Sequence, residues 1–278
     1  MNSKLLFFDV DGTLIDWKRN LPESALEALL KAKEKGHKIF LNTGRARANI
    51  RIPDFKKVGF DGIVAACGSH IEANGKVIYE NLVEDEVLKL TIDTLIKYKM
   101  PAVLEGPEKH FISDWGFVED EFVDYLFKVL GDDAHYLDGY KEGMRINKFS
   151  ADILGMTDYE SIKKNLSPYF EFIVHGITPD IQITDGDYPE KILATVEAVL
   201  KGDSKGNGIK KVCEYTGIDI KDTYAFGDGM NDVEMLSVAG HSIAMGNGKQ
   251  EIKDMCEYVT TDIWDDGIKN ALLHYGLI

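Results

Sequence analysis

Apolar and polar positions divide the first 82 residues into short strands and helices. The apolar run at residues 4–10 is typical of a strand buried on both faces of a sheet. Residues 21–35 carry apolar side chains at helical spacing and stop at Gly36, a residue type that often ends helices. Further short apolar strands are expected at residues 38–41 and 62–66. Strand, helix and strand joined by compact links predict βαβ units and a parallel sheet.

The C-terminal stretch repeats this alternation. Residues 205–216 are predicted to form a helix, and residues 222–226 a strand that ends in Gly-Asp-Gly. A short helix at residues 232–239 and a strand at residues 242–245 follow. Residues 1–82 and 201–278 are therefore predicted to form one α/β core, a Rossmann-like, doubly wound parallel sheet.

The pattern between these two stretches differs, because strands there follow one another with few helices between them. We expect residues 83–200 to form a separate α+β cap domain with an antiparallel sheet, inserted into the core. Its predicted helices are residues 84–99, 119–130 and 159–169, and its predicted strands are residues 101–105, 110–113, 145–153, 170–175, 181–184 and 192–200.

Composition narrows the choice of partners and compartment. With 278 residues, 44% of them hydrophobic, the chain can bury a sizeable core. A net charge of −15 opposes the basic surface of nucleic-acid-binding proteins and repels anionic membranes, so we expect neither as a partner. Three widely spaced cysteines, Cys67, Cys213 and Cys256, match neither a disulfide framework nor a zinc site. Reduced thiols and the lack of a recognisable signal peptide or membrane span favour a cytoplasmic location.

Candidate chemistry lies at the ends of the predicted core strands. Because ligands of parallel α/β sheets bind beyond the carboxyl ends of the strands, these side chains are expected to meet at one edge. They are Asp9, Asp11, Thr43, Lys205, Asp228 and Asp232. Clustered carboxylates repel one another, and a hard cation such as Mg²⁺ with oxygen ligands would relieve this repulsion. The lysine and the hydroxyl suit phosphate oxygens, and aspartate can act as a nucleophile in phosphoryl transfer.

Taken alone, each of these residues could belong to an ordinary turn, a helix cap or, for Lys205, the solvated surface. Together, in this order and at these strand ends, they indicate a phosphoryl-transfer site. The sequence resembles the haloacid dehalogenase-like hydrolases, and within them the Cof-type phosphatases with an α+β cap. Four ordered motifs carry the resemblance: Phe7–Leu14 (FFDVDGTL), Leu41–Arg45 (LNTGR), Ser204–Gly206 (SKG) and Phe226–Asp232 (FGDGMND). One departure follows the third core strand, where the family often has Asn-Gly-Ala and this chain has Ala66-Cys67-Gly68-Ser69.

The resemblance implies a phosphatase with two catalytic aspartates. Asp9 would be the nucleophile, and Asp11 the acid that protonates the leaving alcohol and then the base that activates water. Asp9 and the backbone carbonyl of Asp11 would also bind Mg²⁺, together with Asp228 and, directly or through water, Asp232.

The remaining implied contacts concern the substrate, a small phosphorylated metabolite such as a sugar phosphate. The transferring phosphoryl would be held by Thr43, Gly44, Lys205 and Asn231. Arg45 is a further candidate for substrate contact, as are Arg145 and Lys148 in the proposed cap, whose charges would suit an anionic or polyol substrate.

Two alternatives use the same residues. A phosphomutase or phosphotransferase would pass the phosphoryl group from Asp9 to a sugar hydroxyl instead of to water. A non-enzymatic phospho-receiver also combines acidic residues, a hydroxyl residue, a lysine and Mg²⁺ on a parallel sheet. The Asp9–Asp11 pair, the separate Asp228 and Asp232 cluster and the insert of more than 100 residues oppose the phospho-receiver, whereas the phosphomutase shares these features.

Overall fold

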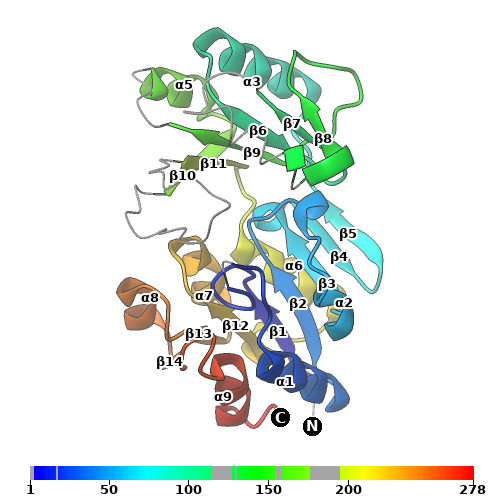
Figure 1. Cartoon of the computed structure of the whole chain (residues 1–278), viewed down its shortest axis with the longest axis vertical. Coiled ribbons are helices and arrows are strands. Elements are labelled where there is room, and N and C mark those ends of the chain that lie inside the picture. The colour runs from blue at the N-terminus through cyan, green and yellow to red at the C-terminus, as the bar shows by residue number, and fades with distance from the viewer. Residues whose placement is uncertain (1–2, 17, 114–126, 129, 154–157, 176–194) are drawn as a thin grey trace. The chain divides into compact units, whose positions relative to one another are not determined.

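The computed structural model describes residues 3–16, 18–113, 127–128, 130–153, 158–175 and 195–278 (Figure 1). The chain divides into two compact units. The core unit comprises Met1–Arg45, Ile50–Glu80 and Gly202–Ile278, and the cap unit comprises Ala46–Asn49 and Asn81–Lys201.

The core unit contains a mixed sheet with the strand order β14-β13-β12-β1-β2-β3-β4-β5. At its centre β1 (Leu5–Phe8) pairs in parallel with β12 (Thr223–Gly227) and β2 (Lys38–Asn42). The parallel part continues through β3 (Gly62–Ala65), β13 (His241–Ala244) and β14 (Tyr258–Val259). The carboxyl ends of β1, β2 and β12 therefore lie side by side, as the sequence predicted.

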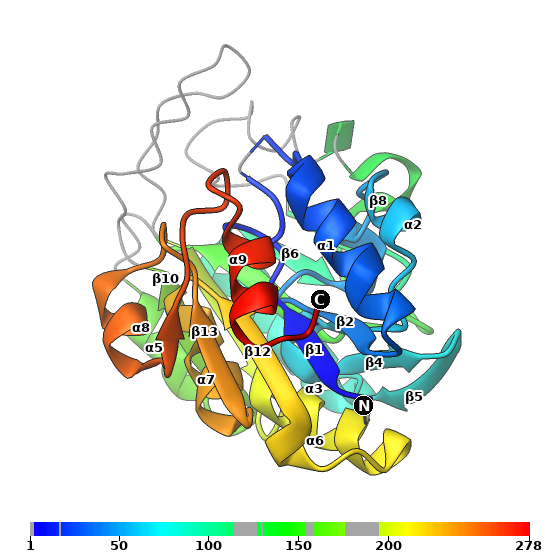
Figure 2. The same ribbon diagram turned by 90° about the horizontal axis from the view of Figure 1, so that it is seen from below.

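Helices cover both faces of this sheet, which confirms the doubly wound arrangement (Figure 2). Because side chains alternate along a strand, β1 buries Leu6 and Phe8 on one face and Leu5 and Phe7 on the other. The first face packs against α1 (Glu23–Glu34), α2 (Phe55–Val58) and α9 (Gly267–His274), and the second against α6 (Lys205–Thr216), α7 (Val233–Val238) and α8 (Gln250–Met255).

An antiparallel hairpin at the edge of the sheet, β4 (His70–Ala73) and β5 (Lys76–Glu80), was not predicted. Its turn is Asn74-Gly75, and both residues have positive φ angles of 51° and 73°. Asn-Gly is the strongest short hairpin signal, since both residues tolerate this conformation. The helices α2, α8 and α9 and the strand β14 were also not predicted.

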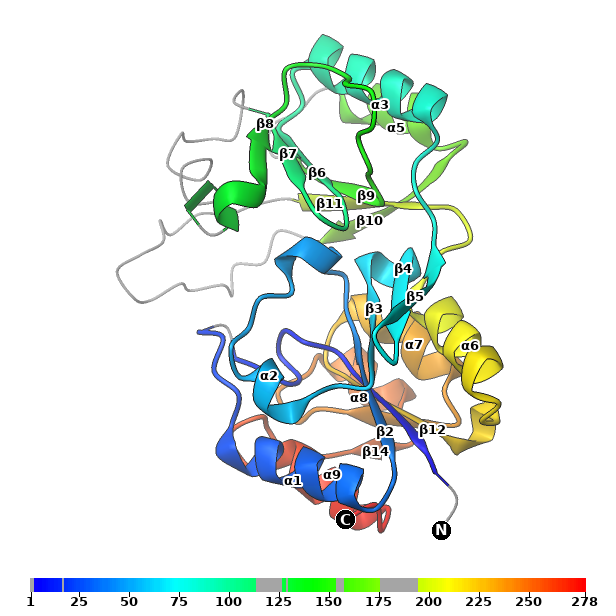
Figure 3. The same cartoon turned by 90° about the vertical axis from the view of Figure 1, so that its right-hand side faces the viewer.

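The cap unit contains a second sheet with the strand order β10-β11-β9-β6-β7-β8. It consists of β6 (Ala102–Glu105), β7 (His110–Ile112), β8 (Ala134–Tyr136), β9 (Lys148–Asp152), β10 (Phe170–His175) and β11 (Thr195–Leu200). All pairs are antiparallel except β7 with β8. Helices α3 (Asp85–Tyr98) and α5 (Tyr159–Leu166) pack on one face, where Leu88, Ile162 and Phe149 share a buried cluster (Figure 3).

This cap sheet agrees with the α+β prediction, although β8 was not predicted. The strand predicted at residues 181–184 and most of the helix predicted at residues 119–130 lie outside the described residues. None of the helices in the described ranges is long and apolar enough to cross a membrane.

Candidate active site

Asp9 directly follows β1, and its position is set from two sides. Its backbone N–H donates to the Phe226 carbonyl of β12 at 3.0 Å, and the residue is only 4% exposed. On the neighbouring helix α6, the Ser204 hydroxyl accepts from the Asn207 N–H and caps the N-terminus. The next residue, Lys205, reaches back so that its Nζ lies 2.5 Å from Asp9 Oδ1.

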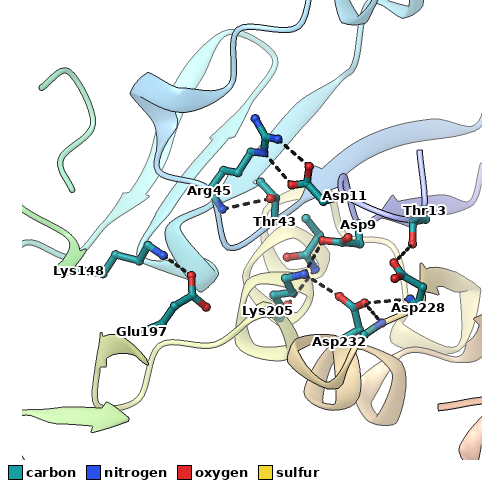
Figure 4. Close-up of polar contacts among 12 residues, drawn as sticks. Asp9, Asp11, Thr13, Thr43, Arg45, Lys148, Glu197, Lys205, Asp228 and Asp232 are labelled. Carbon is teal, nitrogen blue, oxygen red and sulfur yellow. Dashed lines mark hydrogen bonds and ion pairs between the residues drawn. The ribbon is translucent and has the colours of Figure 1, made fainter. Parts of the chain in front are cut away.

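Asp232 links the lysine to the loop after β12. Its Oδ1 accepts from Lys205 Nζ at 2.6 Å, and its Oδ2 accepts the backbone N–H groups of Asp228 and Gly229, each at 3.0 Å (Figure 4). The carboxylate is fully buried and both oxygens have partners. Asp232 therefore fixes the loop that carries Asp228.

The loop after β1 and the loop after β12 are joined to each other. The Thr13 hydroxyl donates to Asp228 Oδ1 at 2.8 Å. Gly12 has a φ of +86°, and a Cβ there would lie 2.3 Å from Asp228 Oδ2, so a glycine is needed for this approach. Asn247 Nδ2 also donates to the Gly12 carbonyl at 2.7 Å, while its Oδ1 accepts the Ile263 N–H at 3.0 Å.

Thr43 follows β2 and is almost fully buried. Its Oγ1 accepts the Arg45 backbone N–H at 3.1 Å, a contact that does not use the hydroxyl proton. The preceding Asn42 donates from Nδ2 to the Lys205 carbonyl at 3.0 Å and so ties β2 to the start of α6. The end of β2 and the lysine are held in one framework.

Asp11 lies apart from the buried carboxylates. Arg45 Nε donates to Asp11 Oδ2 at 2.7 Å and Arg45 Nη2 donates to Asp11 Oδ1 at 2.6 Å (Figure 4). The Asp11 side chain is 52% exposed, whereas that of Asp9 is 6% exposed. Sequence reasoning placed both aspartates at one strand end, but the pairing of Asp11 with Arg45 was not predicted.

Oxygens of Asp9, Asp228 and Asp232 lie within 4.8 Å of one another. When all are ionised, their three negative charges and the one positive charge of Lys205 leave two negative charges without compensation. Burial raises the pKa of Asp9 well above its ordinary value, and Asp232 raises it further while Lys205 opposes the shift. Burial and then repulsion from Asp232 raise the pKa of Asp228 to about 7.

Lys205 is a cation in this cluster. Burial on its own would lower the pKa of its ammonium, but the carboxylates of Asp232 and Asp9 hold that pKa above its ordinary value. A divalent cation fits the rest of the cluster in both charge and donor type. It would compensate the two remaining negative charges, and carboxylate oxygens are the ligands that Mg²⁺ prefers.

If the cluster binds Mg²⁺, its affinity must depend on pH, because the ion needs the ionised Asp228 carboxylate. We expect the apparent affinity to rise at least about tenfold per pH unit up to about pH 7, since Asp9, whose pKa is also raised, must ionise as well. Titration calorimetry across this range measures the slope. The Asp228→Asn variant should lose most of the binding, and an affinity that is independent of pH in the unaltered protein would contradict the assignment.

The same pKa predicts the opposite trend for stability without metal. Asp228 keeps its proton to a higher pH in the folded than in the unfolded chain, so the folded state binds more protons between pH 3.8 and about 7. Its contribution to stability is therefore greatest in acid and falls as the pH rises towards about 7. Thermal unfolding in chelator should show this fall, and added Mg²⁺ should reduce it.

Three residues that support the site were not predicted from the sequence: Thr13, Asn42 and Asn247. Thr13 and Asn42 lie within the first and second motifs, but no role was predicted for either. Asn247 lies in the Gly246-Asn247-Gly248 turn after β13, a strand end in the same parallel sheet. Because ligands of parallel sheets bind at the carboxyl ends of the strands, this position was a signal by which Asn247 could have been predicted.

The other predicted residues are placed as follows. Gly44 follows Thr43, and Asn231 lies in the short 3₁₀ turn Met230–Asp232 between the two later aspartates. In the cap unit, exposed Arg145 pairs with Glu108 at 2.5 Å, and buried Lys148 on β9 pairs with the carboxylates of Glu105 and Glu197. Contact of Arg145 or Lys148 with a substrate stays a prediction.

A cavity of about 540 Å³ lies within the cap unit, between the β6–β7 turn and the loop before β9. Arg145, Lys141 and His135 are among its lining residues, together with Glu108 and Glu142. It contains none of the residues at the ends of the core strands. Mixed charges and an open shape give it no defined ligand chemistry.

Comparisons with known proteins agree with this geometry. The sequence matches the family model of haloacid dehalogenase-like hydrolases over residues 6–272. It is 30% identical over 281 residues to the putative phosphatase YkrA of Bacillus subtilis strain 168, and the alignment covers 100% of both chains.

Two solved structures are similar at 27% identity. One belongs to a study of the conservation of a trigonal-bipyramidal intermediate in a phosphoryl-transfer superfamily, with a TM-score of 0.79 and 100% of both chains covered. The other is BT4131, a sugar phosphatase of HAD subclass IIB, with a TM-score of 0.77, covering 99% of this chain and 100% of that one.

The α/β core with its carboxylate and lysine cluster, together with these relatives, defines a phosphatase with a cap. The chain belongs to the haloacid dehalogenase-like hydrolase family and, within it, to the Cof-type phosphatases, as the four motifs predicted. This membership favours an enzyme over the alternative of a phospho-receiver.

Proposed function

We propose that this phosphatase hydrolyses small phosphorylated metabolites, sugar phosphates in particular, by a Mg²⁺-dependent reaction through an aspartyl-phosphate on Asp9. One observation carries the proposal. The buried Asp9 carboxylate has an oxygen 2.5 Å from Lys205 Nζ, with the carboxylates of Asp228 and Asp232 beside it. A nucleophile, a cation and a metal-binding group thus lie together at the end of the central strand.

In the first half of the reaction, an oxygen of Asp9 attacks phosphorus in line with the leaving oxygen. The bond between phosphorus and the leaving oxygen breaks, and its electron pair goes to that oxygen. Asp11 donates a proton to the leaving oxygen, so the alcohol departs neutral and Asp9 carries the phosphoryl group.

In the second half, water attacks the phosphorus of the aspartyl-phosphate and gives a proton to Asp11. The bond between phosphorus and Asp9 breaks, which releases phosphate and restores both carboxyl groups. Asp9 must be ionised to attack, and Lys205 favours this form while burial and Asp232 oppose it.

The phosphoryl oxygens would be held by the cation of Lys205, the hydroxyl proton of Thr43 and polar groups of Gly44 and Asn231. Mg²⁺ would be held by Asp9, Asp228, the Asp11 carbonyl and, directly or through water, Asp232. When bound, Mg²⁺ supplies positive charge that neutralises the phosphoryl oxygens as charge develops on them.

The proposal is tested by measuring phosphate release from a panel of phosphorylated metabolites, with Mg²⁺ and with chelator. We expect turnover only with the metal and the highest kcat/KM among phosphate esters of sugars and similar small alcohols. Reaction in ¹⁸O-labelled water should place one labelled oxygen in the released phosphate, because water is the acceptor. Full activity in chelator, or transfer of the phosphoryl group to a sugar hydroxyl without release of phosphate, would overturn the proposal.

A further inference from the structure

Arg45 and Asp11 form a side-on ion pair in which two N–H groups of one guanidinium meet two oxygens of one carboxylate. The distances are 2.7 Å from Nε to Oδ2 and 2.6 Å from Nη2 to Oδ1. This two-point geometry fixes the direction of the carboxylate as well as its location, which a single contact would not do. Figure 4 shows the Asp11 carboxylate directed towards Arg45.

The arginine projects from a rigid backbone. Its N–H donates to Thr43 Oγ1 at 3.1 Å, and its carbonyl accepts the Ala66 N–H at 2.8 Å. Its side chain is only 14% exposed, so its rotamers are restricted by neighbouring atoms.

The backbone around Asp11 is equally constrained. Gly12 N–H donates to the Ile15 carbonyl at 2.9 Å, and the N–H groups of Leu14 and Ile15 donate to the Val10 carbonyl at 3.1 and 3.0 Å. What stays adjustable is the Asp11 side chain, which is 52% exposed. Without Arg45, that side chain would be free to adopt several rotamers in water.

The direction of the reaction decides what this restraint does. Asp9 is buried, and in-line attack sends the leaving oxygen away from the nucleophile. The leaving oxygen therefore points away from the buried side of the site, and the Asp11 carboxylate is the more exposed of the two, with 52% of its side chain exposed against 6% for Asp9. A proton donor contributes only when it is within hydrogen-bond reach of the atom that it protonates.

We propose that Arg45 is a positioning residue that aims the Asp11 carboxyl at the leaving-group oxygen. This inference rests on the proposed function and deepens it, because it assigns Arg45 to proton transfer instead of to direct contact with the substrate. One Asp11 oxygen exchanges its N–H partner for the leaving oxygen during turnover, while the second contact to Arg45 keeps the carboxyl aimed.

The two roles for Arg45 predict different substrate dependence. The comparison is made in kcat/KM, which reports only the steps up to release of the alcohol and not the later hydrolysis of the aspartyl-phosphate, for which Asp11 is also the base. In kcat/KM, a residue that contacts only the phosphoryl group affects every phosphate ester alike, whereas one that acts through Asp11 affects only esters whose leaving group needs a proton. Para-nitrophenyl phosphate has an acidic leaving group that departs as an anion. Benzyl phosphate has a similar size but releases an alcohol, which needs protonation.

The experiment compares kcat and KM of the unaltered enzyme, Arg45→Gln, Asp11→Asn and the double variant on both esters with saturating Mg²⁺. For benzyl phosphate we expect Arg45→Gln to lower kcat/KM at least ~10-fold, because the general acid is no longer aimed at the leaving oxygen. For para-nitrophenyl phosphate we expect a loss below ~3-fold. The double variant should be no slower on benzyl phosphate than Asp11→Asn alone, because the two residues act as one unit.

Arg45→Lys keeps the charge and loses the two-point geometry, so it should also lose more activity on benzyl than on para-nitrophenyl phosphate. It carries the same test if Arg45→Gln folds poorly. Equal losses of kcat/KM on both esters, or additive losses of kcat/KM in the double variant, would each overturn the positioning role while leaving the proposed function intact. An unaltered enzyme without metal-dependent turnover would overturn both.

Discussion

Replacing Asp9 by asparagine is expected to reduce metal-dependent phosphate release at least ~10³-fold, the scale seen when a reacting group is removed. The amide keeps the size of the side chain but cannot attack phosphorus. The amide oxygen can still accept a hydrogen bond from Lys205, so the variant should fold. It should also bind Mg²⁺ through the carboxylates of Asp228 and Asp232, though less tightly. Phosphate release measures the loss of activity, and circular dichroism measures whether the variant is folded.

The matched control for this change is Asp93→Asn, an equal loss of one carboxylate on the exposed side of α3. It should leave kcat within ~2-fold of the unaltered enzyme, as expected for a surface substitution. Retention of near-normal turnover by Asp9→Asn would show that another group attacks phosphorus.

Replacing Lys205 by methionine should lower both the rate of phosphate release and the melting temperature. Lys205 is fully buried, and its Nζ contacts Asp9 at 2.5 Å and Asp232 at 2.6 Å, so its loss leaves buried carboxylates facing one another. Breaking a buried ion pair from one side costs about 3–5 kcal/mol. In chelator at neutral pH we expect a fall in melting temperature of roughly 6 °C or more. Activity should fall at least ~10²-fold, since the cation no longer stabilises the phosphoryl oxygens.

Two conditions should reduce the stability loss of Lys205→Met. Mg²⁺ restores positive charge to the cluster, and acid protonates the carboxylates whose pKa values burial has raised. The control is Lys210→Met, an exposed lysine on the same helix, for which the change in melting temperature should be small. A Lys205→Met protein as stable as the unaltered chain in chelator would contradict the charge balance described for this site.

The strand ends were predictable because their signal is local. The apolar run before Asp9 and that of β12 are typical of buried strands, whatever the rest of the chain does. The helix α6 is recognised from the helical spacing of its apolar residues. Parallel pairing then brings distant strand ends together without further information. The ion pairs of Lys205 with Asp9 and Asp232 follow from this arrangement.

The pairing of Arg45 with Asp11 could not be predicted in the same way. The two residues are 34 positions apart, and their contact depends on side-chain direction within loops that have no periodic pattern. Lys148 is a similar case. Lysine is rarely buried, so a buried lysine between Glu105 and Glu197 requires knowledge of which residues oppose it in the sheet.

The missed hairpin has a different cause. In the four-residue strand β4, polar His70 and Glu72 alternate with the core residues Ile71 and Ala73, and the His70 ring hydrogen-bonds to the Glu72 carboxylate. Two apolar positions are too few to identify a strand. Pattern alone therefore failed, whereas the Asn74-Gly75 turn between them and β5 was a sufficient signal.

The central claim is that Asp9 becomes phosphorylated during turnover. The most direct measurement is mass spectrometry of enzyme that is acid-quenched during turnover and digested with a protease. Our account predicts the added mass of one phosphoryl group on the peptide that contains Asp9, only with Mg²⁺ and not in Asp9→Asn. A phosphoryl group on any other residue, or none on Asp9 under conditions in which substrate is consumed, would contradict it.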